Sequence, residues 1–175
     1  TWFEESAQRE KRAMDLEKFL KTHLCKALLD GQSLEMPTTA TLSFTLPSQF
    51  TVDSGSNHLT LSRASAYQKF TGNRDQWLEA WESYRSDFAS VRHCEIHTDS
   101  FRQVPNRVDI ISSKVDLAVS MASGGIFHES FRIESHYEGV DPALSAFHIQ
   151  QDRRVVLPRP IFRNATNERI PDHHF

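Results

Sequence analysis

The stretch IFHESFRIESHYEGV, residues 126–140, alternates large apolar and polar side chains in the way that a β-strand does. Successive side chains of a strand point to opposite faces, so this stretch predicts a strand with one apolar and one polar face. The apolar face holds Phe127, Phe131, Ile133 and Tyr137, and the polar face holds His128, Arg132, Glu134 and His136. The functional question is whether that polar face meets water or lines a pocket.

The stretches on either side of this strand alternate in the same way. In residues 113–121 the apolar members are Val115, Leu117, Val119 and Met121, opposite Lys114, Asp116 and Ser120. In residues 144–150, Phe147 and Ile149 lie opposite His148 and Gln150. Together with residues 91–101, these stretches predict a meander of antiparallel strands, with a bulge in the last strand near Asp152.

Two earlier segments have the three- and four-residue spacing of amphipathic helices. The first covers residues 4–30, and Gly31 is placed to end it as a C-terminal cap. The second covers residues 73–90 and begins with a capping box formed by Asn73 and Gln76. Its aromatic stripe consists of Trp77, Trp81, Tyr84 and Phe88. Such a stripe predicts core packing, and the alternative is the aromatic wall of a pocket for an organic ligand.

The segment between the two helices is less regular. The turn sequence DSGSN, residues 53–57, is flanked by short alternating stretches and predicts a hairpin. After it, SAYQKF, residues 65–70, predicts a brief helix before Gly72.

Length and charge narrow the class of protein. The 175 residues predict a single domain over residues 1–160, followed by a polar tail at 161–175. The formal net charge of −3 does not favour non-specific binding to nucleic acid. No apolar run approaches the roughly 18 residues of a membrane-spanning helix, so no membrane partner is expected.

Cys25 and Cys94 are the two cysteines of the chain, too few for a disulfide scaffold. A reducing, cytoplasmic setting is therefore expected, with pairing of the two cysteines as the alternative. The chain begins at Thr1, so a preceding targeting segment cannot be judged. Asn164 begins a tripeptide that matches a glycosylation acceptor.

The order of these elements resembles the SnoaL-like branch of the nuclear transport factor 2-like superfamily, over roughly residues 10–160. The resemblance is carried by the helix 73–90 and then by EIHTDSF, SKVDLAVS and FHIQQDRRVV in the second half of the chain. It implies an α+β fold, the cystatin-like cone, in which a strongly curved antiparallel sheet wraps around long helices and encloses a central pocket. Members of the superfamily often form homodimers through the sheet, so a homodimer is expected.

The family includes polyketide cyclases, ketosteroid isomerase, scytalone dehydratase, limonene epoxide hydrolase and members without catalytic activity. Lys114 and Asp116 resemble the Arg-x-Asp pair of the epoxide hydrolases, with lysine in place of arginine. The second aspartate of those enzymes would lie near residues 157–159, where this chain has Pro158. The resemblance therefore does not favour an epoxide hydrolase.

Two interpretations of the polar strand face remain open. In the first, the apolar face packs on the helices and the polar face meets water, as in other half-solvated antiparallel sheets. In the second, the polar face lines the pocket and supplies acid–base chemistry, because histidine titrates near neutral pH. A metal site is not expected, since His128 and His136 would lie roughly 26 Å apart on one extended strand.

The second interpretation predicts a cofactor-independent isomerase, cyclase or dehydratase that acts on a hydrophobic polycyclic or terpenoid-like small molecule. His136 and His148 would exchange protons, Glu134 or Asp116 would orient them, and Arg132 would stabilise developing negative charge. The residues expected to contact the substrate are Trp77, Trp81, Tyr84, Phe131, Tyr137 and His128. The alternative function is a non-catalytic module of the same fold that binds a ligand or a protein.

Overall fold

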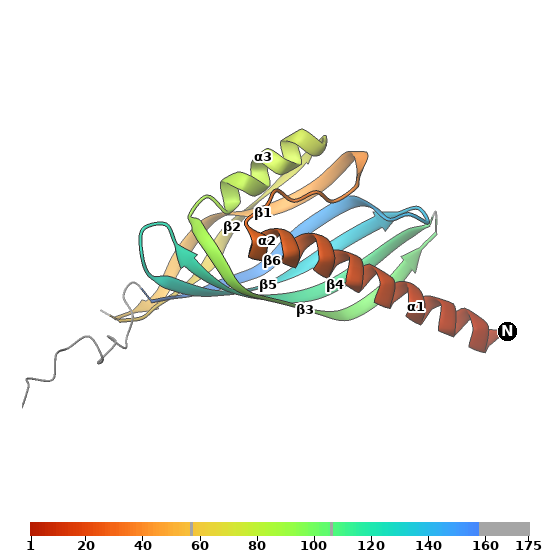
Figure 1. Ribbon diagram of the computed structural model, residues 1–175, viewed down its shortest axis with the longest axis horizontal. Coiled ribbons are helices and arrows are strands. Elements are labelled where there is room, and N and C mark those ends of the chain that lie inside the picture. Colours follow the sequence, from red (N-terminus) through yellow and green to blue (C-terminus); the bar gives the residue numbers. More distant parts are fainter. Residues whose placement is uncertain (57, 106, 158–175) are drawn as a thin grey trace, which may run out of the picture.

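The computed structural model describes residues 1–56, 58–105 and 107–157 (Figure 1). The predicted tail at 161–175, the glycosylation acceptor at Asn164 and Pro158 lie outside these residues. The helical elements are α1 (Trp2–Leu20), the π-helix η1 (Lys21–Cys25), α2 (Lys26–Asp30) and α3 (Arg74–Tyr84). The strands are β1 (Thr38–Gly55), β2 (Thr60–Gly72), β3 (Phe88–Val104), β4 (Val108–Met121), β5 (Ile126–Glu138) and β6 (Ala143–Leu157).

The strands form one sheet in the order β1-β2-β6-β5-β4-β3. Strands β3 to β6 are an antiparallel meander, as the alternation of the second half predicts. The β1–β2 hairpin joins this meander in two ways. Residues 38–45 of β1 pair in parallel with residues 144–148 of β6, whereas residues 60–63 of β2 pair antiparallel with residues 153–156. The hairpin therefore presents a different strand to β6 at each of its ends.

The helices all lie on one side of the sheet, with α1, η1 and α2 forming one continuous rod and α3 lying over the hairpin (Figure 1). The apolar sheet face beneath them is buried within the single chain. Its members Val115, Leu117, Phe131, Ile133, Phe147 and Ile149 are at most 2% exposed. The first interpretation of the strand faces is therefore confirmed, and the polar face is the outer one. No helix within the described residues is long and apolar enough to cross a membrane.

The predicted architecture, a strongly curved sheet wrapped around long helices as a cone with a central pocket, is wrong. Of the described residues, 58% lie in the six strands and 26% in helices, and α1 is the one long helix. The side chains between α3 and the sheet pack against one another, since Trp77 contacts Phe44 and Phe147 with ring centroids 5.4 and 4.8 Å apart. The molecule is mainly a six-stranded sheet with helices on one face.

Some of the predictions about individual helices and turns are confirmed, and others are wrong. The Asn73–Gln76 capping box is confirmed, and Gly31 ends α2 with a φ of 64°. The hairpin around residues 53–57 is also confirmed, with Gly55 paired to Thr60. Two helix predictions are wrong: residues 65–70 belong to β2, and the helix predicted at 73–90 ends at Tyr84, so that its last aromatic residue begins β3.

A disulfide joins Cys25 of η1 to Cys94 of β3, with the two Cα atoms 5.5 Å apart. The alternative prediction, that the two cysteines pair with each other, is therefore confirmed. The bond closes a sequence separation of 69 residues and ties the N-terminal helical rod to the edge strand of the sheet. Leu16, Leu20 and Leu24 of the rod are fully buried, so the bond holds a helix that also packs on the core.

Trp81→Ala is expected to lower the free energy of unfolding by about 3–5 kcal/mol, because the side chain is 1% exposed and its removal leaves a cavity. The control is Trp2→Ala, since Trp2 is 72% exposed and its loss is expected to change stability by less than about 0.5 kcal/mol. Urea unfolding measures both. Equal losses in the two variants would contradict the assignment of Trp81 to the core.

Replacing both Cys25 and Cys94 by alanine is expected to cost about 2–5 kcal/mol of stability, because the cross-link restricts the unfolded chain. The measurement is denaturant unfolding of the oxidised protein, with and without a reductant. The reductant should lower the stability of the native sequence by a similar amount and leave the double variant unchanged. A native protein whose unfolding midpoint ignores reductant would show that the disulfide does not stabilise the fold.

Candidate functional site

The structure brings three of the predicted catalytic residues together on the outer face of the sheet. Nε2 of His136 lies 3.3 Å from Oε2 of Glu134, and the rings of His136 and His148 are 6.1 Å apart. Nδ1 of His148 lies 2.7 Å from Oγ1 of Thr45. Burial, together with the neighbouring His136, lowers the pKa of His148. These residues form a local cluster, but on the side of the sheet opposite to the helices.

The other predicted polar residues pair elsewhere on that face. Asp116 makes an ion pair with Lys114, with Oδ2 and Nζ 3.8 Å apart. Arg132 forms an ion pair with Asp99, and its Nη2 donates to Ser112 Oγ at 3.3 Å. His128 is exposed. Asp116 and Arg132 therefore pair with residues other than His136 and His148.

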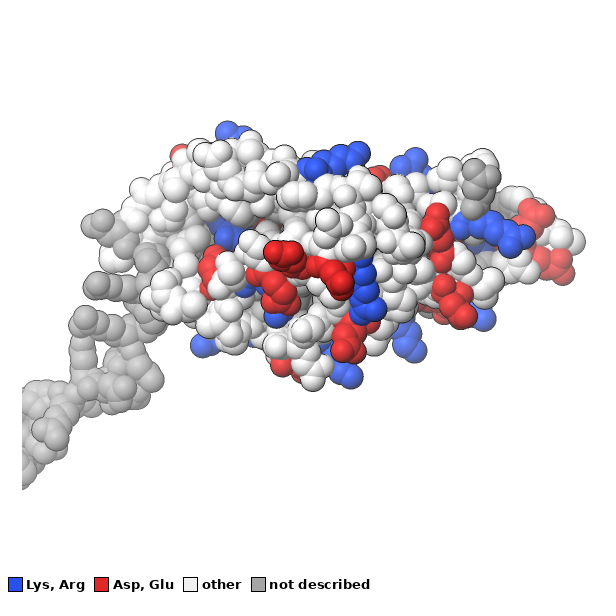
Figure 2. Space-filling model, turned by 90° about the horizontal axis from the view of Figure 1, so that it is seen from above, with Lys and Arg blue, Asp and Glu red and all other residues white. Residues whose placement is uncertain are grey.

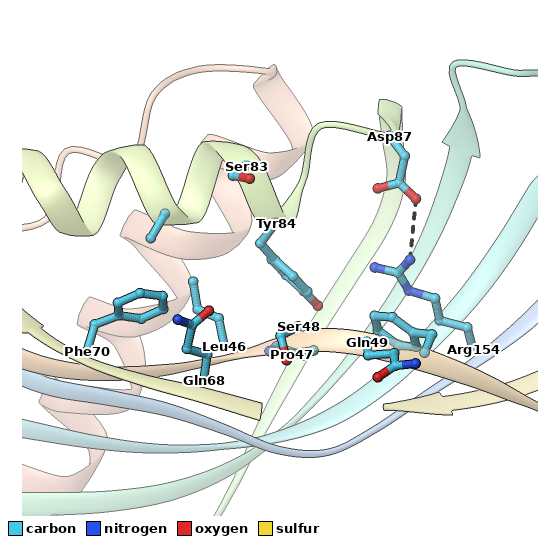
Figure 3. Close-up of a pocket in the computed structure, with 12 residues that line it drawn as sticks. Leu46, Pro47, Ser48, Gln49, Gln68, Phe70, Ser83, Tyr84, Asp87 and Arg154 are labelled. Atoms are coloured by element: carbon cyan, nitrogen blue, oxygen red, sulfur yellow. Dashed lines mark hydrogen bonds and ion pairs between the residues drawn. The ribbon is translucent and has the colours of Figure 1, made fainter. Parts of the chain in front are cut away.

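Most of the aromatic residues predicted to contact a substrate are core residues. Trp77, Trp81, Phe131 and Tyr137 are at most 1% exposed. Tyr84 differs from them, because it lines a cavity of about 450 Å³ between α3 and the β1–β2 hairpin (Figure 3). The lining residues are Leu46, Pro47, Ser48, Gln49, Phe50, Gln68, Phe70, Ala80, Ser83, Tyr84, Asp87 and Arg154.

Behind the wall of this cavity lies a buried polar cluster, which we call the acid cluster: Tyr84, Glu129, Asp152 and Arg154. Glu129 and Asp152 are each 1% exposed. The Tyr84 hydroxyl contacts Oε1 of Glu129 and lies 2.9 Å from Oδ2 of Asp152. Nε of Arg154 lies 3.2 Å from Oε2 of Glu129, an ion pair without a well-aligned hydrogen bond. Two buried carboxyl groups thus share one tyrosine hydroxyl.

A bulge in β6 places Asp152 in the cluster. Between the pairs Ser130↔Arg153 and Arg132↔Gln150, β6 holds one residue more than β5 does. Gln151 takes up this extra length with a φ of 52°, in the left-handed region that residues other than glycine seldom adopt. The predicted bulge near Asp152 is therefore confirmed. It turns this carboxyl group inward, onto the face that Glu129 occupies.

The hairpin leaves a gap in the sheet at the same place. Its pairing with β6 changes from β1 to β2 between residues 148 and 153 of β6. The backbone N–H of Asp152 donates instead to the Tyr67 hydroxyl of β2, at 2.8 Å. A side chain thus replaces a strand partner, and the backbone donor stays satisfied.

Asp152 is the carboxyl group of the cluster that carries a proton. Burial, and after it the charge of Glu129, raises the pKa of Asp152 to about 10. Glu129 has Arg154 beside it as a counter-ion, whereas Oδ1 of Asp152 has no hydrogen-bond partner among the described residues. Burial and the two carboxyl groups also raise the pKa of Tyr84 well above its usual value.

The geometry of the cluster restricts where its protons lie. One hydroxyl hydrogen of Tyr84 cannot serve two acceptors, and Arg154 faces Glu129 rather than Asp152, so Asp152 donates its proton to Tyr84 and Tyr84 donates to Glu129. The result is a hydrogen-bonded chain that runs from a neutral acid to a carboxylate. Its middle member, Tyr84, lines the cavity.

Arg154 links the acid cluster to the cavity mouth. Its Nη1 lies 3.3 Å from Oδ2 of Asp87, the contact drawn in Figure 3. Its guanidinium lies 4.1 Å from the ring centroid of Phe50 and 4.8 Å from that of Phe127. The cation is therefore held by two carboxylates and by aromatic faces, which compensate for its burial.

The sequence interpretation missed Glu129, Asp152, Arg154 and Asp87. A signal was available for Glu129, which stands between Phe127 and Phe131 on the apolar face of residues 126–140. A carboxylate at a buried position of a strand is unusual and marks a candidate site. For Asp152 the one signal was the predicted bulge, because a bulge reverses the faces of β6 from that point on.

No protein-family model and no curated protein matches the chain. The resemblance to the SnoaL-like branch therefore stays a prediction, and the site is argued from its geometry. Within the ranges 1–56, 58–105 and 107–157, no group of three or more His, Cys, Asp or Glu side chains is placed to hold a metal ion.

Asp152→Asn is expected to flatten the pH dependence of stability. The folded-state pKa of about 10 lies above the usual 3.8, so the folded state holds a proton that the unfolded state releases. Stability should therefore fall as pH rises between these values, by up to about 1.4 kcal/mol per pH unit. The asparagine variant, neutral throughout, should be the more stable protein near pH 9.

Denaturant unfolding at several pH values between about pH 5 and about pH 9 measures this difference. Asp141→Asn is the matched control, since Asp141 is an exposed aspartate in the turn between β5 and β6. The control should keep the slope of the native protein. An Asp152→Asn variant with that same slope would show that Asp152 is ionised in the folded protein.

Proposed function

We propose that this chain catalyses proton transfer on a small organic molecule held between α3 and the β1–β2 hairpin, without a cofactor. One observation supports the proposal: the neutral acid Asp152 is joined through Tyr84 to ionised Glu129, directly behind a cavity wall. A carboxylic acid that keeps its proton near neutral pH can act as a general acid.

The chemistry that suits this chain is an acid-catalysed isomerisation or dehydration. A substrate oxygen in the cavity would accept the hydroxyl hydrogen of Tyr84, and Asp152 would replace that hydrogen. In a dehydration, the protonated hydroxyl group leaves as water and the substrate then loses a proton from carbon. That proton returns to Asp152 through Tyr84, so Asp152 is protonated again at the end of the reaction. Arg154 stabilises the negative charge left on the two carboxyl groups.

The cavity lining narrows the substrate class. Leu46 and Phe70 offer apolar surface, whereas Gln49 and Gln68 offer amide groups. The hydrophobic polycyclic or terpenoid-like molecule expected from the sequence would leave these amides without partners if it had no polar group of its own. We therefore propose a substrate with an apolar body and at least one polar group.

The second candidate function is a binding module without catalysis. In the free protein, the Tyr84 hydroxyl contacts Glu129 and Asp152, which are both buried. Both partners of this hydroxyl lie behind the cavity wall rather than in the cavity. The acid cluster could therefore serve only to set the shape and the charge of that wall. This candidate predicts binding of the same molecules with no turnover.

The disulfide bears on the compartment in which the protein works. Disulfides persist in oxidising compartments and are rare in the cytosol, where thiols are kept reduced. We therefore propose an oxidising compartment in place of the cytoplasmic location expected from the cysteine count. The Cys25–Cys94 bond is the observation that supports this change.

The main reason for expecting a homodimer does not hold. It rested on an apolar sheet face that a second subunit would have to cover, and the chain's own helices cover that face. The outer face is polar, with Arg132, Glu134 and His136 each only partly buried. A homodimer stays a prediction without support from the described residues, and light scattering at micromolar concentration would test it.

Proton transfer can be detected before the natural substrate is known. We expect the protein to catalyse deuterium incorporation from heavy water into members of a panel of small alcohols and ketones, followed by NMR. Asp152→Asn and Tyr84→Phe should each lower the rate by about 10²–10⁴-fold, the usual contribution of a positioned acid. Asp141→Asn is the control and should keep the full rate.

The same assay separates the two candidate sites. If His136→Ala or His148→Ala removes the activity while Asp152→Asn keeps it, the chemistry belongs to the outer face. If molecules of the panel bind in the cavity and none is turned over, the binding module replaces the enzyme.

A further inference from the structure

A second cavity extends the first along α3. It measures about 350 Å³ and shares Phe70, Ala80 and Ser83 with the first cavity. The two together form a trough, which we call the α3 trough, between α3 and the β1–β2 hairpin. Seen from above, acidic side chains gather near the middle of the face that carries α3 (Figure 2). Two carboxylates line the trough itself, Glu79 in the second cavity and Asp87 in the first.

The charges around the α3 trough do not balance. Arg154 is the one cation among the lining residues of the two cavities, and it is already engaged by Glu129 and Asp87. One guanidinium therefore faces two carboxyl groups, those of Glu129 and Asp87, and Glu79 adds a third acidic side chain further along. The trough thus carries a net negative charge that no side chain lining it neutralises.

The acid cluster behind the wall of the trough also has an acceptor without a partner. Oδ1 of Asp152 is buried and has no hydrogen-bond partner among the described residues. A buried polar atom without a partner costs stability, and natural proteins seldom keep one without a function. The contacts within the acid cluster therefore leave one buried acceptor of Asp152 unsatisfied.

We propose that the α3 trough binds a molecule that carries a protonated amine, with the ammonium group beside Asp87 and the apolar body over Leu46 and Phe70. This inference rests on the proposed function, since it names the substrate class of the same site. An ammonium group would supply the missing positive charge at a carboxylate that is 44% exposed and so open to a ligand.

The alternatives fit the charges less well. An anionic ligand would need Arg154, but Nε and Nη1 of this residue already face carboxylates. The same carboxylates would repel the anion. A neutral ligand would leave the excess negative charge as it is. The aromatic lining also suits a cation, as the stacking of Arg154 on the Phe50 ring at 4.1 Å shows within this site.

Three probes with one apolar body test the proposal: phenylpropylamine, phenylpropanol and phenylpropanoate. They differ in the charge of the head group alone, and calorimetric titration of the full chain measures the affinity of each. The amine should bind roughly 10-fold to 100-fold more tightly than the alcohol, as expected for a charged hydrogen bond. The carboxylate should bind most weakly. Added salt should reduce the advantage of the amine.

Asp87→Asn gives the sharpest comparison, because it removes one charge and keeps the shape. The amine should lose about tenfold in affinity, the alcohol should be unaffected, and the carboxylate should gain, since Arg154 then has one carboxylate fewer. Glu79→Gln changes an exposed helix residue and should weaken the amine about twofold to threefold without a risk to folding. Asp141→Asn, on a remote turn, is the control and should change none of the three affinities.

Each other outcome overturns the proposal. Equal affinities for the amine and the alcohol would show that charge is not recognised. Tightest binding of the carboxylate would show that Arg154 is the recognition group. Failure of all three probes to bind would remove the trough as an amine site.

The failure of this inference is distinguishable from that of the proposed function. An amine preference that Asp87→Asn abolishes, in a protein that incorporates no deuterium into any compound, would leave an amine-binding module. Proton transfer that depends on Asp152, on substrates for which an amine makes no difference, would leave the enzyme and remove the amine.

Discussion

The burial of one sheet face beneath α1, α2 and α3 is the constraint on which the rest of the structure depends. A six-stranded sheet with an uncovered apolar face would expose far more apolar surface than a monomer tolerates. Here the covering elements come from the same chain, and the disulfide fixes the N-terminal rod to β3. Most side chains that point inward from β4, β5 and β6 therefore lose contact with water, whatever their chemistry.

That constraint gives the acid cluster its properties. Glu129 occupies an inward position of β5, and the bulge in β6 turns Asp152 to the same side. Two carboxyl groups buried together cannot both ionise at low cost, so one keeps its proton and the other takes Arg154 as its counter-ion. The same groups on the outer face would be solvated and would titrate as ordinary surface acids.

Such a cluster is costly to keep in a core. Replacing a buried ion network by apolar side chains of similar volume is often neutral or stabilising, so stability alone does not explain its presence. Its position behind a cavity favours a role at that cavity as the reason for its presence. The outer-face pair of His136 and His148 lacks this feature, because its residues are partly exposed to solvent.

The sequence by itself determined the strand alternation, the capping box of α3, the end of α2 at Gly31 and the aromatic stripe that includes Trp77 and Trp81. These features depend on neighbours within a few residues, which any window of the sequence contains. Residues 65–70 were misassigned because their partners are β1 residues some 20 positions away. The overall architecture was also beyond the sequence, since element order does not specify how far helices and sheet enclose one another.

Only the tertiary structure decided which polar groups lie together. Tyr84, Glu129 and Asp152 come from α3, β5 and β6, and they meet where the β6 bulge turns inward and the hairpin leaves the neighbouring edge of β6 without a strand partner. A bulge inverts the alternation of every later residue in its strand, so the inward side of Asp152 could not be inferred from the pattern before it. The pairing of Cys25 with Cys94 was decided in the same way, by the approach of two segments distant in sequence.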